Sequence, residues 1–393
     1  MNILFLSTWF PFPPDNGCKI RAFYLLRSLA EAHRVTLVAF NPNPQDPFTA
    51  PPNVTVYPVH ADPFRYVRLP QIIKYLSPVP LAFWRNKKME AKLEQLRKQE
   101  QWDAIVALEV MIASYALRFA DIPRVLDIDT ALSYQLYERY QEQRTRTGRW
   151  RAWISWYKAY RYECALFQRF PACTLVSSAE VMSVQAMAGA ATRVEVIRNG
   201  VDCTHHHPGL AEVRPNTLVY NGALTYSANY DAMRYFLAEI YPLIKQEVPD
   251  ITLSITGSTK GVDVHSLQLD DSVRLTGYVD DIRLPVASST LCVVPIRQGG
   301  GTRLKILEAM ALGTPVVATS KGAEGLDAVA GKHLLVADSP SDFAAATVSL
   351  LKDDALRRRL ATQARTLMEA QYGWGSIGQQ FVQLVEDTVL QHG

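Results

Sequence analysis

Short apolar runs alternate with longer amphipathic segments along the whole chain. In the first half, runs rich in Val, Ile and Leu occupy residues 3–9, 34–40, 53–59, 104–110, 124–129, 173–178 and 194–197. In the second half, similar runs occupy residues 217–223, 251–258, 273–279, 291–296, 315–319 and 333–338. Near-continuous apolar runs are typical of parallel strands that helices cover on both faces. The pattern therefore predicts an α/β fold.

The segments between these runs have helical spacing. Over residues 18–33, for example, apolar side chains recur every three residues, at Ile20, Phe23, Leu26 and Leu29. Two series of strands predict two doubly wound domains rather than one large sheet. The break falls in residues 198–216, which are polar, rich in His, Pro and Gly, and without period. We expect one domain over residues 1–198 and a second over residues 199–370.

Composition narrows the class of protein. The chain has 393 residues, of which 48% are hydrophobic and 20% charged, as in a globular protein of two domains. A net charge of +3 is too small for a nucleic-acid binder. The cysteines are scattered and lack CxxC spacing, which argues against a disulfide framework or a zinc site. The first ten residues fit a strand better than a signal peptide, and no run of about 20 apolar residues occurs. We expect a cytoplasmic protein.

Ligands of open parallel sheets bind beyond the carboxyl ends of the strands, so the loops there carry the chemistry. The first such loop ends in Asn16-Gly17 and enters a helix. A glycine at that place lets a phosphate approach free N–H groups, although a simple turn glycine is equally compatible. No G-x-G-x-x-G follows a strand and no GxxxxGK[ST] occurs. The dinucleotide and P-loop interpretations are therefore weak.

The densest candidate chemistry lies in residues 295–326, "PIRQGGGTRLKILEAMALGTPVVATSKGAEGL". Three glycines lead into a predicted helix that carries Arg303, Lys305 and Glu308. Such a helix start can hold an anion, and the two cations can neutralise a diphosphate without a metal. Glu308, one turn further on, can accept hydrogen bonds from both ribose hydroxyls. The alternatives are an ordinary loop before a helix and a glutamate in a salt bridge.

The same stretch resembles the donor site of retaining glycosyltransferases of the GT-B fold, in the large family four. "WFPFPPDNGCKIRAF" resembles the N-terminal glycine loop of that family, and "LVSSAEVMSV" and "VEVIRNGVD" resemble its last N-domain strands and hinge. "VRLTGYVDDI" and "GAEGL" resemble further parts of its donor-binding core. The resemblance covers most of the chain. It implies a first, acceptor-binding domain, a second, donor-binding domain, and a helix in residues 371–393 that returns to the first domain.

The resemblance also implies roles for particular residues. In such enzymes the helix glutamate binds the donor ribose, the glycine loop meets the diphosphate, and the loop after the third strand of the second domain meets the base. The donor-binding residues expected on this basis are Gly17, Gly222, Tyr278, Val279, Gly299, Gly300, Gly301, Thr302, Arg303, Leu304 and Glu308.

The chain departs from the family pattern at several positions. The first of two glutamates eight residues apart would fall at Gly300. Relatives often place an Arg and a Lys near the diphosphate where this chain has Ala223 and residues 227–229, so Arg303 and Lys305 are the expected replacements. An alignment on the strand puts Asp129 where many relatives have a histidine, and Glu109 matches an acidic position of some relatives. The expected catalytic residues are Asp129, Glu109, Arg303 and Lys305.

The implied function is transfer of a sugar from a UDP- or GDP-linked donor to a glycan, lipid-linked or small acceptor, with retention and without metal or cofactor. A nucleotide-sugar 2-epimerase and a non-catalytic nucleotide-sugar-binding protein stay open as alternatives. Asp127-Ile128-Asp129 is a D-x-D, the metal motif of the other large transferase fold, but that interpretation leaves the second half of the chain unexplained. Three adjacent histidines at 205–207 suit a polar linker better than a metal site.

Residues 144–163 combine basic and aromatic side chains, with no acidic residue before Glu163. Arginines and tryptophans at helical spacing suit an interfacial helix on anionic lipid. We therefore expect peripheral contact with the inner membrane leaflet through this segment. The alternative is a packed amphipathic helix with a solvated basic face, in which the tryptophans are buried.

Overall fold

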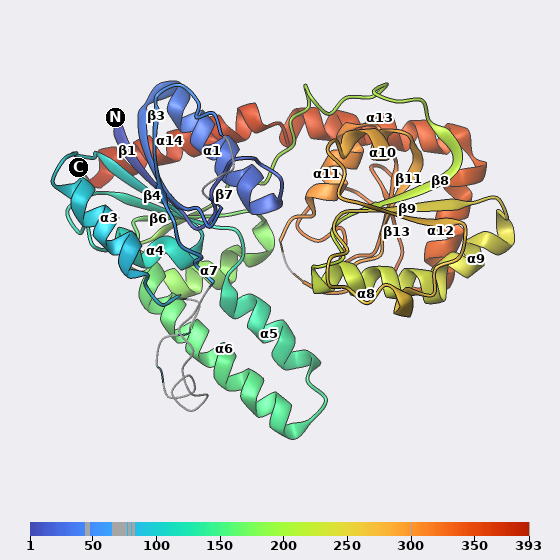
Figure 1. Ribbon diagram of the computed structural model, residues 1–393, viewed down its shortest axis with the longest axis horizontal. Coiled ribbons are helices and arrows are strands. Elements are labelled where there is room, and N and C mark those ends of the chain that lie inside the picture. The colour runs from blue at the N-terminus through green and yellow to red at the C-terminus, as the bar shows by residue number, and fades with distance from the viewer. Residues whose placement is uncertain (44–47, 65–76, 78–79, 81–82, 300, 393) are drawn as a thin grey trace. The chain divides into compact units, whose positions relative to one another are not determined.

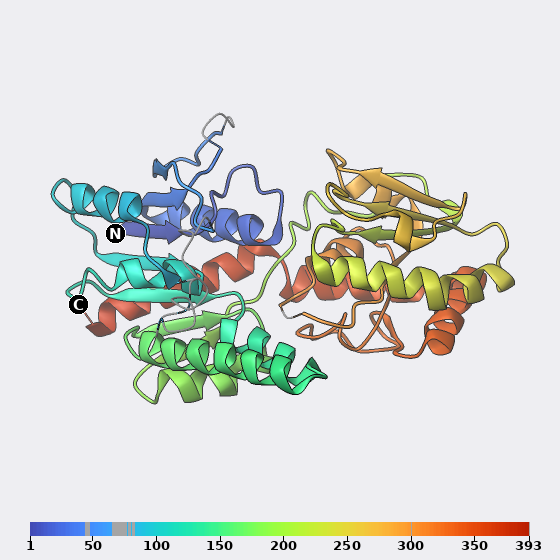
Figure 2. The ribbon, with the colours of Figure 1, turned by 60° about the horizontal axis from the view of Figure 1, so that its bottom comes forward.

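The computed structural model describes residues 1–43, 48–64, 77, 80, 83–299 and 301–392. The chain divides into two compact units. The first comprises Met1–Arg198 and Gly375–Gly393, and the second comprises Asn199–Trp374. Each unit contains one parallel sheet between layers of helices (Figures 1 and 2). The predicted fold class is confirmed.

The first unit has a seven-stranded sheet in the order β3-β2-β1-β4-β5-β6-β7. All seven strands coincide with the apolar runs of the sequence. Their bounds are β1 Asn2–Ser7, β2 Arg34–Phe40, β3 Val54–Val59, β4 Ala104–Leu108, β5 Arg124–Ile128, β6 Ala172–Leu175 and β7 Arg193–Val196. Strands β1, β4 and β5 are almost wholly buried, because helices cover both of their faces.

The helices of the first unit pack against the two faces of this sheet. Helices α3, α4, α6 and α7 pack their apolar side chains against one face, and helices α1 and α14 cover the other. Their bounds are α1 Gly17–Ala32, α3 Lys87–Arg97, α4 Val110–Ala116, α5 Leu132–Glu142, α6 Arg146–Phe167, α7 Val181–Ala188 and α14 Trp374–His392. A β-carbon at Gly378 would collide with the Ser28 side chain, so α14 crosses α1 closely and residues 375–392 form part of this unit.

Helix α1 begins where the sequence predicts it. The Asn16 side chain accepts a hydrogen bond from the backbone N–H of Lys19 at 3.2 Å, which caps the helix at Gly17. One turn further on, the buried Arg21 guanidinium forms an ion pair with Asp127 of β5. Arg21 also donates to the carbonyls of Ile197 and Arg198. This one side chain therefore ties together α1, β5 and the last residues before the second unit.

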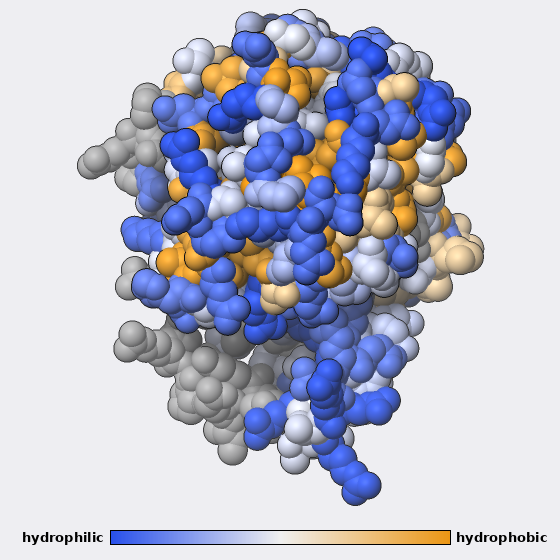
Figure 3. Space-filling view, turned by 90° about the vertical axis from the view of Figure 1, so that its right-hand side faces the viewer, coloured by the Kyte–Doolittle hydropathy of each residue, from blue (hydrophilic) through white to orange (hydrophobic). Residues whose placement is uncertain are grey.

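The second unit has a six-stranded sheet in the order β10-β9-β8-β11-β12-β13. Its strands are β8 Arg214–Asn221, β9 Thr252–Thr256, β10 Val273–Gly277, β11 Ser289–Val294, β12 Val316–Ala318 and β13 Leu335–Val336. Helices α10 Arg283–Ala287, α11 Leu304–Ala311 and α13 Asp354–Gln371 pack on one face. Helices α8 Ser227–Tyr235, α9 Tyr241–Glu247 and α12 Pro340–Lys352 pack on the other, with a π-helical turn over Phe236–Ile240. In the view of Figure 3, hydrophilic residues are interspersed with apolar ones over the surface.

Helices α5 and α6 form a hairpin that extends away from the first sheet (Figure 1). Its base is fixed by Glu163, which is fully buried in α6 and accepts hydrogen bonds from the backbone N–H groups of Leu132 and Ser133 at 2.7 and 2.9 Å. A carboxylate at this place satisfies the free N–H groups at the start of α5. Glu163, the one acidic residue of the basic segment, therefore has a structural role at the base of the hairpin.

Candidate functional site

The second sheet reverses its strand order between β8 and β11, and the candidate donor residues gather at that point. Such a switch point at the carboxyl ends of the strands is where open α/β sheets bind ligands. Gly222 directly follows β8 and Gly299 follows β11, whereas Tyr278 follows β10 at the edge of the sheet. Helix α11 then carries Lys305 and Glu308 back beside β8. Residues that are distant in the sequence thus form one cluster.

Glu308 lies beside the end of β8. The side-chain amide of Asn221 donates to a Glu308 carboxylate oxygen at 2.9 Å. An amide donor leaves this carboxylate able to accept further hydrogen bonds, as ribose binding would require. Burial raises the pKa of Glu308 to about 7, against the opposing effect of the nearby Lys305. The charge of this carboxylate is therefore sensitive to what binds beside it.

Lys305 reaches across to the loop after β8. Its ammonium donates to the side-chain oxygen of Asn229 at 3.0 Å and lies 3.9 Å from the centre of the Tyr220 ring. A β-carbon at Gly222 would come within 2.6 Å of the Lys305 side-chain nitrogen, so a larger residue there would displace this side chain. Burial, with a smaller contribution from the nearby positive charge of Arg303, lowers the pKa of Lys305 to about 7. The Lys305 side chain thus reaches the segment between β8 and α8.

The glycine loop needs glycine for its backbone. Gly299 and Gly301 have φ angles of 91° and 81°, in the left-handed region that L side chains rarely adopt. Arg303, at the start of α11, is buried and donates to the carbonyl of Gly299. Thr302 has a buried hydroxyl without a hydrogen-bond partner in the described part of the chain. Gly300 lies outside the described residues.

The expected base-binding loop lies at the edge of the second sheet. Tyr278 and Val279 follow β10, whose last residue, Gly277, has a φ angle of 69°. Tyr278 is highly exposed, as a side chain at the rim of a site would be. Leu304, the first residue of α11, packs partly against the core of this unit, so only its backbone could face a ligand.

The first sheet brings Glu109 and Asp129 together at its carboxyl edge. Glu109 directly follows β4 and has a left-handed φ of 77°, which is strained for a residue with a side chain. Asp129 directly follows β5. Burial raises the pKa of Glu109 to about 8, and the negative charge of Asp129 adds to the rise. Two carboxyl groups so placed do not both ionise readily near neutral pH.

Cys18 belongs to the same cluster, which the sequence did not reveal. It follows Gly17 in the first turn of α1. Burial and the adjacent Glu109 and Asp129 carboxylates hold the pKa of the Cys18 thiol well above its usual value. The thiol therefore stays protonated. Gly17 thus lies next to the acidic pair of the first unit, whereas the other expected donor residues belong to the second unit.

The D-x-D motif does not present both of its carboxylates at the edge of the sheet. Asp127 is fully buried, and its oxygens accept hydrogen bonds from Arg21 at 2.5 and 2.7 Å and from Thr174 at 2.5 Å. Only Asp129 of the pair remains at the edge of the sheet. No group of three or more side chains suited to a metal ion occurs within residues 1–43, 48–64, 77, 80, 83–299 and 301–392.

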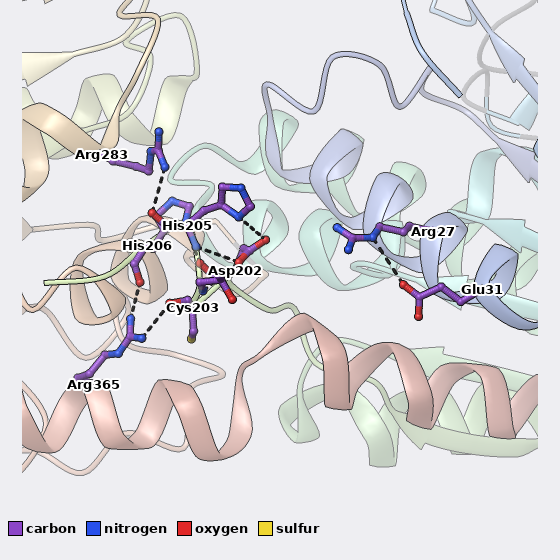
Figure 4. Close-up of polar contacts among 9 residues, drawn as sticks. Arg27, Glu31, Asp202, Cys203, His205, His206, Arg283 and Arg365 are labelled. Atoms are coloured by element: carbon purple, nitrogen blue, oxygen red, sulfur yellow. Dashed lines mark hydrogen bonds and ion pairs between the residues drawn. The ribbon is translucent and has the colours of Figure 1, made fainter. Parts of the chain in front are cut away.

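The three histidines of the predicted linker each contact a different oxygen. His205 contacts the Asp202 carboxylate, His206 the Asp202 carbonyl and His207 the Pro208 carbonyl. Figure 4 shows Arg283 and Arg365 holding this segment through backbone carbonyls, Arg283 at His205 and Arg365 at Cys203 and His206. The linker is therefore an ordered part of the second unit.

Two family models match the chain. "Glycosyltransferase Family 4" matches residues 16–205, and "Glycosyl transferases group 1" matches residues 215–353. The chain therefore contains a domain of each of these two glycosyltransferase families. The two matches meet between residues 205 and 215, close to the boundary between the two units.

Relatives and solved structures agree with this assignment. The chain is 29% identical over 163 residues to a phosphatidyl-myo-inositol mannosyltransferase of Mycobacterium leprae, which covers 40% of this chain and 43% of that protein. It is 32% identical over 131 residues to a mannosylfructose-phosphate synthase of Agrobacterium fabrum, and that match covers 32% of this chain and 29% of that protein. The matched segments thus span less than half of these relatives. A sucrose-phosphate synthase structure from Thermosynechococcus elongatus superposes with a TM-score of 0.77, at 18% identity over 99% of both chains.

A second solved structure shares the fold. Anabaena HepE in complex with UDP and glucose superposes with a TM-score of 0.67, at 17% identity over 98% of this chain and all of that one. At such low identity the likeness shows the GT-B fold of this glycosyltransferase and does not transfer the ligand. None of its described helices is both long and apolar enough to cross a membrane.

Proposed function

We propose that this glycosyltransferase moves a sugar from a UDP- or GDP-linked donor to a hydroxyl group of an acceptor, with retention of configuration and without a metal ion. The observation that carries the proposal is the placement of Lys305 and Glu308 at the switch point of the second sheet. Lys305 stands over Gly222, and Glu308 lies beside Asn221. A cation and a carboxylate at this spacing suit the diphosphate and the ribose of a nucleotide sugar.

The reaction breaks the bond between the anomeric carbon and the donor diphosphate, and negative charge grows on the leaving phosphate. Arg303, Lys305 and the N–H groups at the start of α11 are fixed donors for that charge. Each well-placed donor of this kind is worth roughly 3 to 4 kcal/mol. The acceptor oxygen forms the new bond on the same face, and its proton passes to the leaving phosphate, which balances the step.

We assign Glu109 and Asp129 to the acceptor. A carboxyl that stays protonated near neutral pH can donate a hydrogen bond to an acceptor hydroxyl, and an ionised neighbour can accept one. The raised pKa of Glu109 and its closeness to Asp129 fit this division of roles. The same pair is what an epimerase would require, so the two functions are separated by product analysis.

The test begins with a thermal-shift screen of UDP-, GDP- and ADP-sugars, because a ligand that binds the folded chain raises its stability by mass action. We expect a UDP- or GDP-sugar to raise the melting temperature. Product analysis then follows with and without acceptors. Conversion of the donor to an epimer without any acceptor would show that the protein is an epimerase and not a transferase. Binding without turnover under all conditions would leave a non-catalytic binding protein.

We further propose that the acceptor is lipid-linked and that the α5–α6 hairpin contacts an anionic membrane. Trp150 and Trp153 are 65% and 39% exposed, whereas a purely packed helix would bury them. At 100° per residue, Arg146, Arg149 and Tyr157 lie on the same side of α6 as these rings, and α6 has no acidic residue before Glu163. This exposed face suits the headgroup region of a bilayer.

Sedimentation with anionic vesicles tests the membrane contact. Each basic side chain near an anionic surface contributes about 1 kcal/mol, so the chain should pellet at low salt and be released at high salt. Replacing Arg144, Arg146, Arg149 and Arg151 by Ser should abolish pelleting. A matched control replaces four exposed cations of α3 and its end, Lys87, Lys88, Arg97 and Lys98, by Ser. If the control and the hairpin variant lose pelleting equally, the hairpin is not the contact surface.

A further inference from the structure

Asn229 holds a position that the family pattern does not explain. It lies in the first turns of α8 and is only 9% exposed. Its side-chain oxygen accepts two hydrogen bonds, from the Tyr220 hydroxyl at 2.6 Å and from the Lys305 ammonium at 3.0 Å. Its side-chain nitrogen donates to the carbonyl of Ala223 at 2.9 Å. Both polar atoms of its side chain are therefore hydrogen-bonded, which fixes the orientation of the amide.

This arrangement fixes the Lys305 ammonium from three sides. The Tyr220 ring lies below it at 3.9 Å, the Asn229 oxygen lies beside it, and the backbone at Gly222 leaves room for it. Tyr220 is fully buried in the core, and so provides a rigid base. A flexible lysine side chain loses much conformational entropy when it is ordered, and here the ordering is complete before a ligand arrives.

We propose that Asn229 is the positioning residue for Lys305, and that donor binding makes the Lys305 amine take up a proton when it meets the diphosphate. The proposal rests on the proposed function and adds to it how this chain holds its cation for the diphosphate in place. Asn229 can hold the side chain of Lys305 in either protonation state, because its uncharged amide oxygen can accept a hydrogen bond from the ammonium and from the neutral amine.

The charged and titratable groups around Lys305 are consistent with proton uptake. Arg303 at the start of α11 opposes the ammonium, Glu308 one turn further on favours it, and the buried thiol of Cys292 on β11 stays protonated because burial raises its pKa to about 12. The pKa of Lys305 is about 7 before binding. A diphosphate adjacent to the amine favours the charged form, so the pKa rises on binding and a proton enters above about pH 7.

The experiment is isothermal titration calorimetry with UDP-glucose and GDP-mannose, whose diphosphate diesters do not titrate near neutral pH. Measurements in buffers of different ionisation enthalpy count the protons taken up. At about pH 8 the wild type should take up a proton, and its affinity should fall with rising pH, approaching about tenfold per pH unit. Glu308 is largely ionised at that pH and so contributes little.

Two variants separate a positioning role from a structural one. Asn229→Asp keeps the shape and adds a charge that holds Lys305 protonated in advance, so proton uptake should disappear while the fold is kept. Asn229→Leu removes the hydrogen bond and should weaken donor binding by about tenfold or more. Lys305→Met should lose both the uptake and the pH dependence.

The outcomes are distinct. If the wild type binds neither nucleotide sugar, the proposed function falls, and this inference falls with it. If it binds one of them without proton uptake, or if Asn229→Asp takes up a proton like the wild type, the positioning role of Asn229 is wrong while the donor site stands.

Discussion

At the carboxyl edge of the first sheet, Glu109 and Asp129 place two acids next to the thiol of Cys18, and burial raises the pKa of both Glu109 and Cys18. At the same edge of the second sheet, Lys305 and Glu308 place a cation and an acid on one helix, and each has a pKa near 7. The two units share one architecture. They therefore show that the fold provides the position of a site, whereas the side chains that follow each strand decide its chemistry.

The two edges also differ in how they are supported. In the first unit a buried ion pair, Arg21 with Asp127, lies directly behind the acidic cluster. In the second unit neutral amides, Asn221 and Asn229, hold the charged groups. A buried ion pair is rigid but costly to disturb, while an amide tolerates a change of protonation in its partner. The first edge is thus suited to holding its side chains in a fixed geometry, and the second to reversible binding of a charged ligand.

The largest effect is expected from Asp127→Ala. The substitution leaves the Arg21 charge buried without its carboxylate partner, which should lower the free energy of unfolding by about 3 to 5 kcal/mol. Urea denaturation measures it. The matched control is Asp129→Ala, two residues further on and at the solvent-accessible edge, for which a much smaller loss is expected. Equal losses for the two variants would mean that the ion pair is not the support of this edge.

The next effect concerns the second edge. Glu308→Ala should lose hydrogen bonds to the donor ribose, and Arg303→Ala should lose neutralisation of the diphosphate. Each should reduce donor affinity by about 1.5 to 3 kcal/mol, the range for hydrogen bonds to charged groups. Calorimetry checks this, with Glu247→Ala as the control, since Glu247 pairs with Lys352 on the surface of the same unit. Wild-type affinity in both site variants would mean that the donor binds elsewhere.

A smaller effect distinguishes the acids of the first edge. The pKa of Glu109 in the folded chain is about 8, above its ordinary value of 4.5. The folded chain therefore holds this proton more tightly than the unfolded chain does. The resulting stabilisation is fully present below about pH 4.5 and is lost as the pH rises through 8. Each pKa unit is worth about 1.4 kcal/mol, and with partial solvent access we expect Glu109→Gln to be more stable than wild type by about 1 to 2 kcal/mol at alkaline pH. Thermal unfolding as a function of pH measures the difference. No difference between acidic and alkaline pH would show that Glu109 ionises normally.

No effect is expected from a chelator. Arg303 and Lys305 supply the positive charge for the diphosphate, and Asp127 of the D-x-D motif is committed to Arg21 and Thr174. Activity with and without EDTA should therefore be equal. Loss of activity that Mg²⁺ or Mn²⁺ restores would contradict a metal-independent donor site and return attention to Asp129.

Much of the fold could be predicted from the sequence because strands buried on both faces leave a strong signal. All thirteen strands coincide with the apolar runs, and α1 begins one residue before the predicted start. Gly299 and Gly301 could be recognised because a left-handed backbone requires glycine at both positions. The family assignment followed from the same ordered motifs.

Contacts between distant segments could not be predicted in this way. The spacing of Lys305 and Glu308 could be recognised because both lie on one helix. Their partners are distant in the sequence: Asn229 is 76 residues from Lys305, and Asn221 is 87 residues from Glu308. Cys18 and Glu109 likewise come together only because parallel strands end at one edge of the sheet. No local pattern indicates which amide or thiol will stand next to a charged group.

The sequence by itself determined the fold class, the two series of strands and the presence of a phosphate-compatible glycine loop, because apolar periodicity and backbone requirements are local properties. Only the tertiary structure decided that Asp127 is buried in an ion pair while Asp129 stays at the edge. It also decided that Lys305 stands over Gly222 and that Trp150 is exposed on α6. Burial, charge and pKa depend on which segments the fold brings together, and that is a property of the whole packed unit.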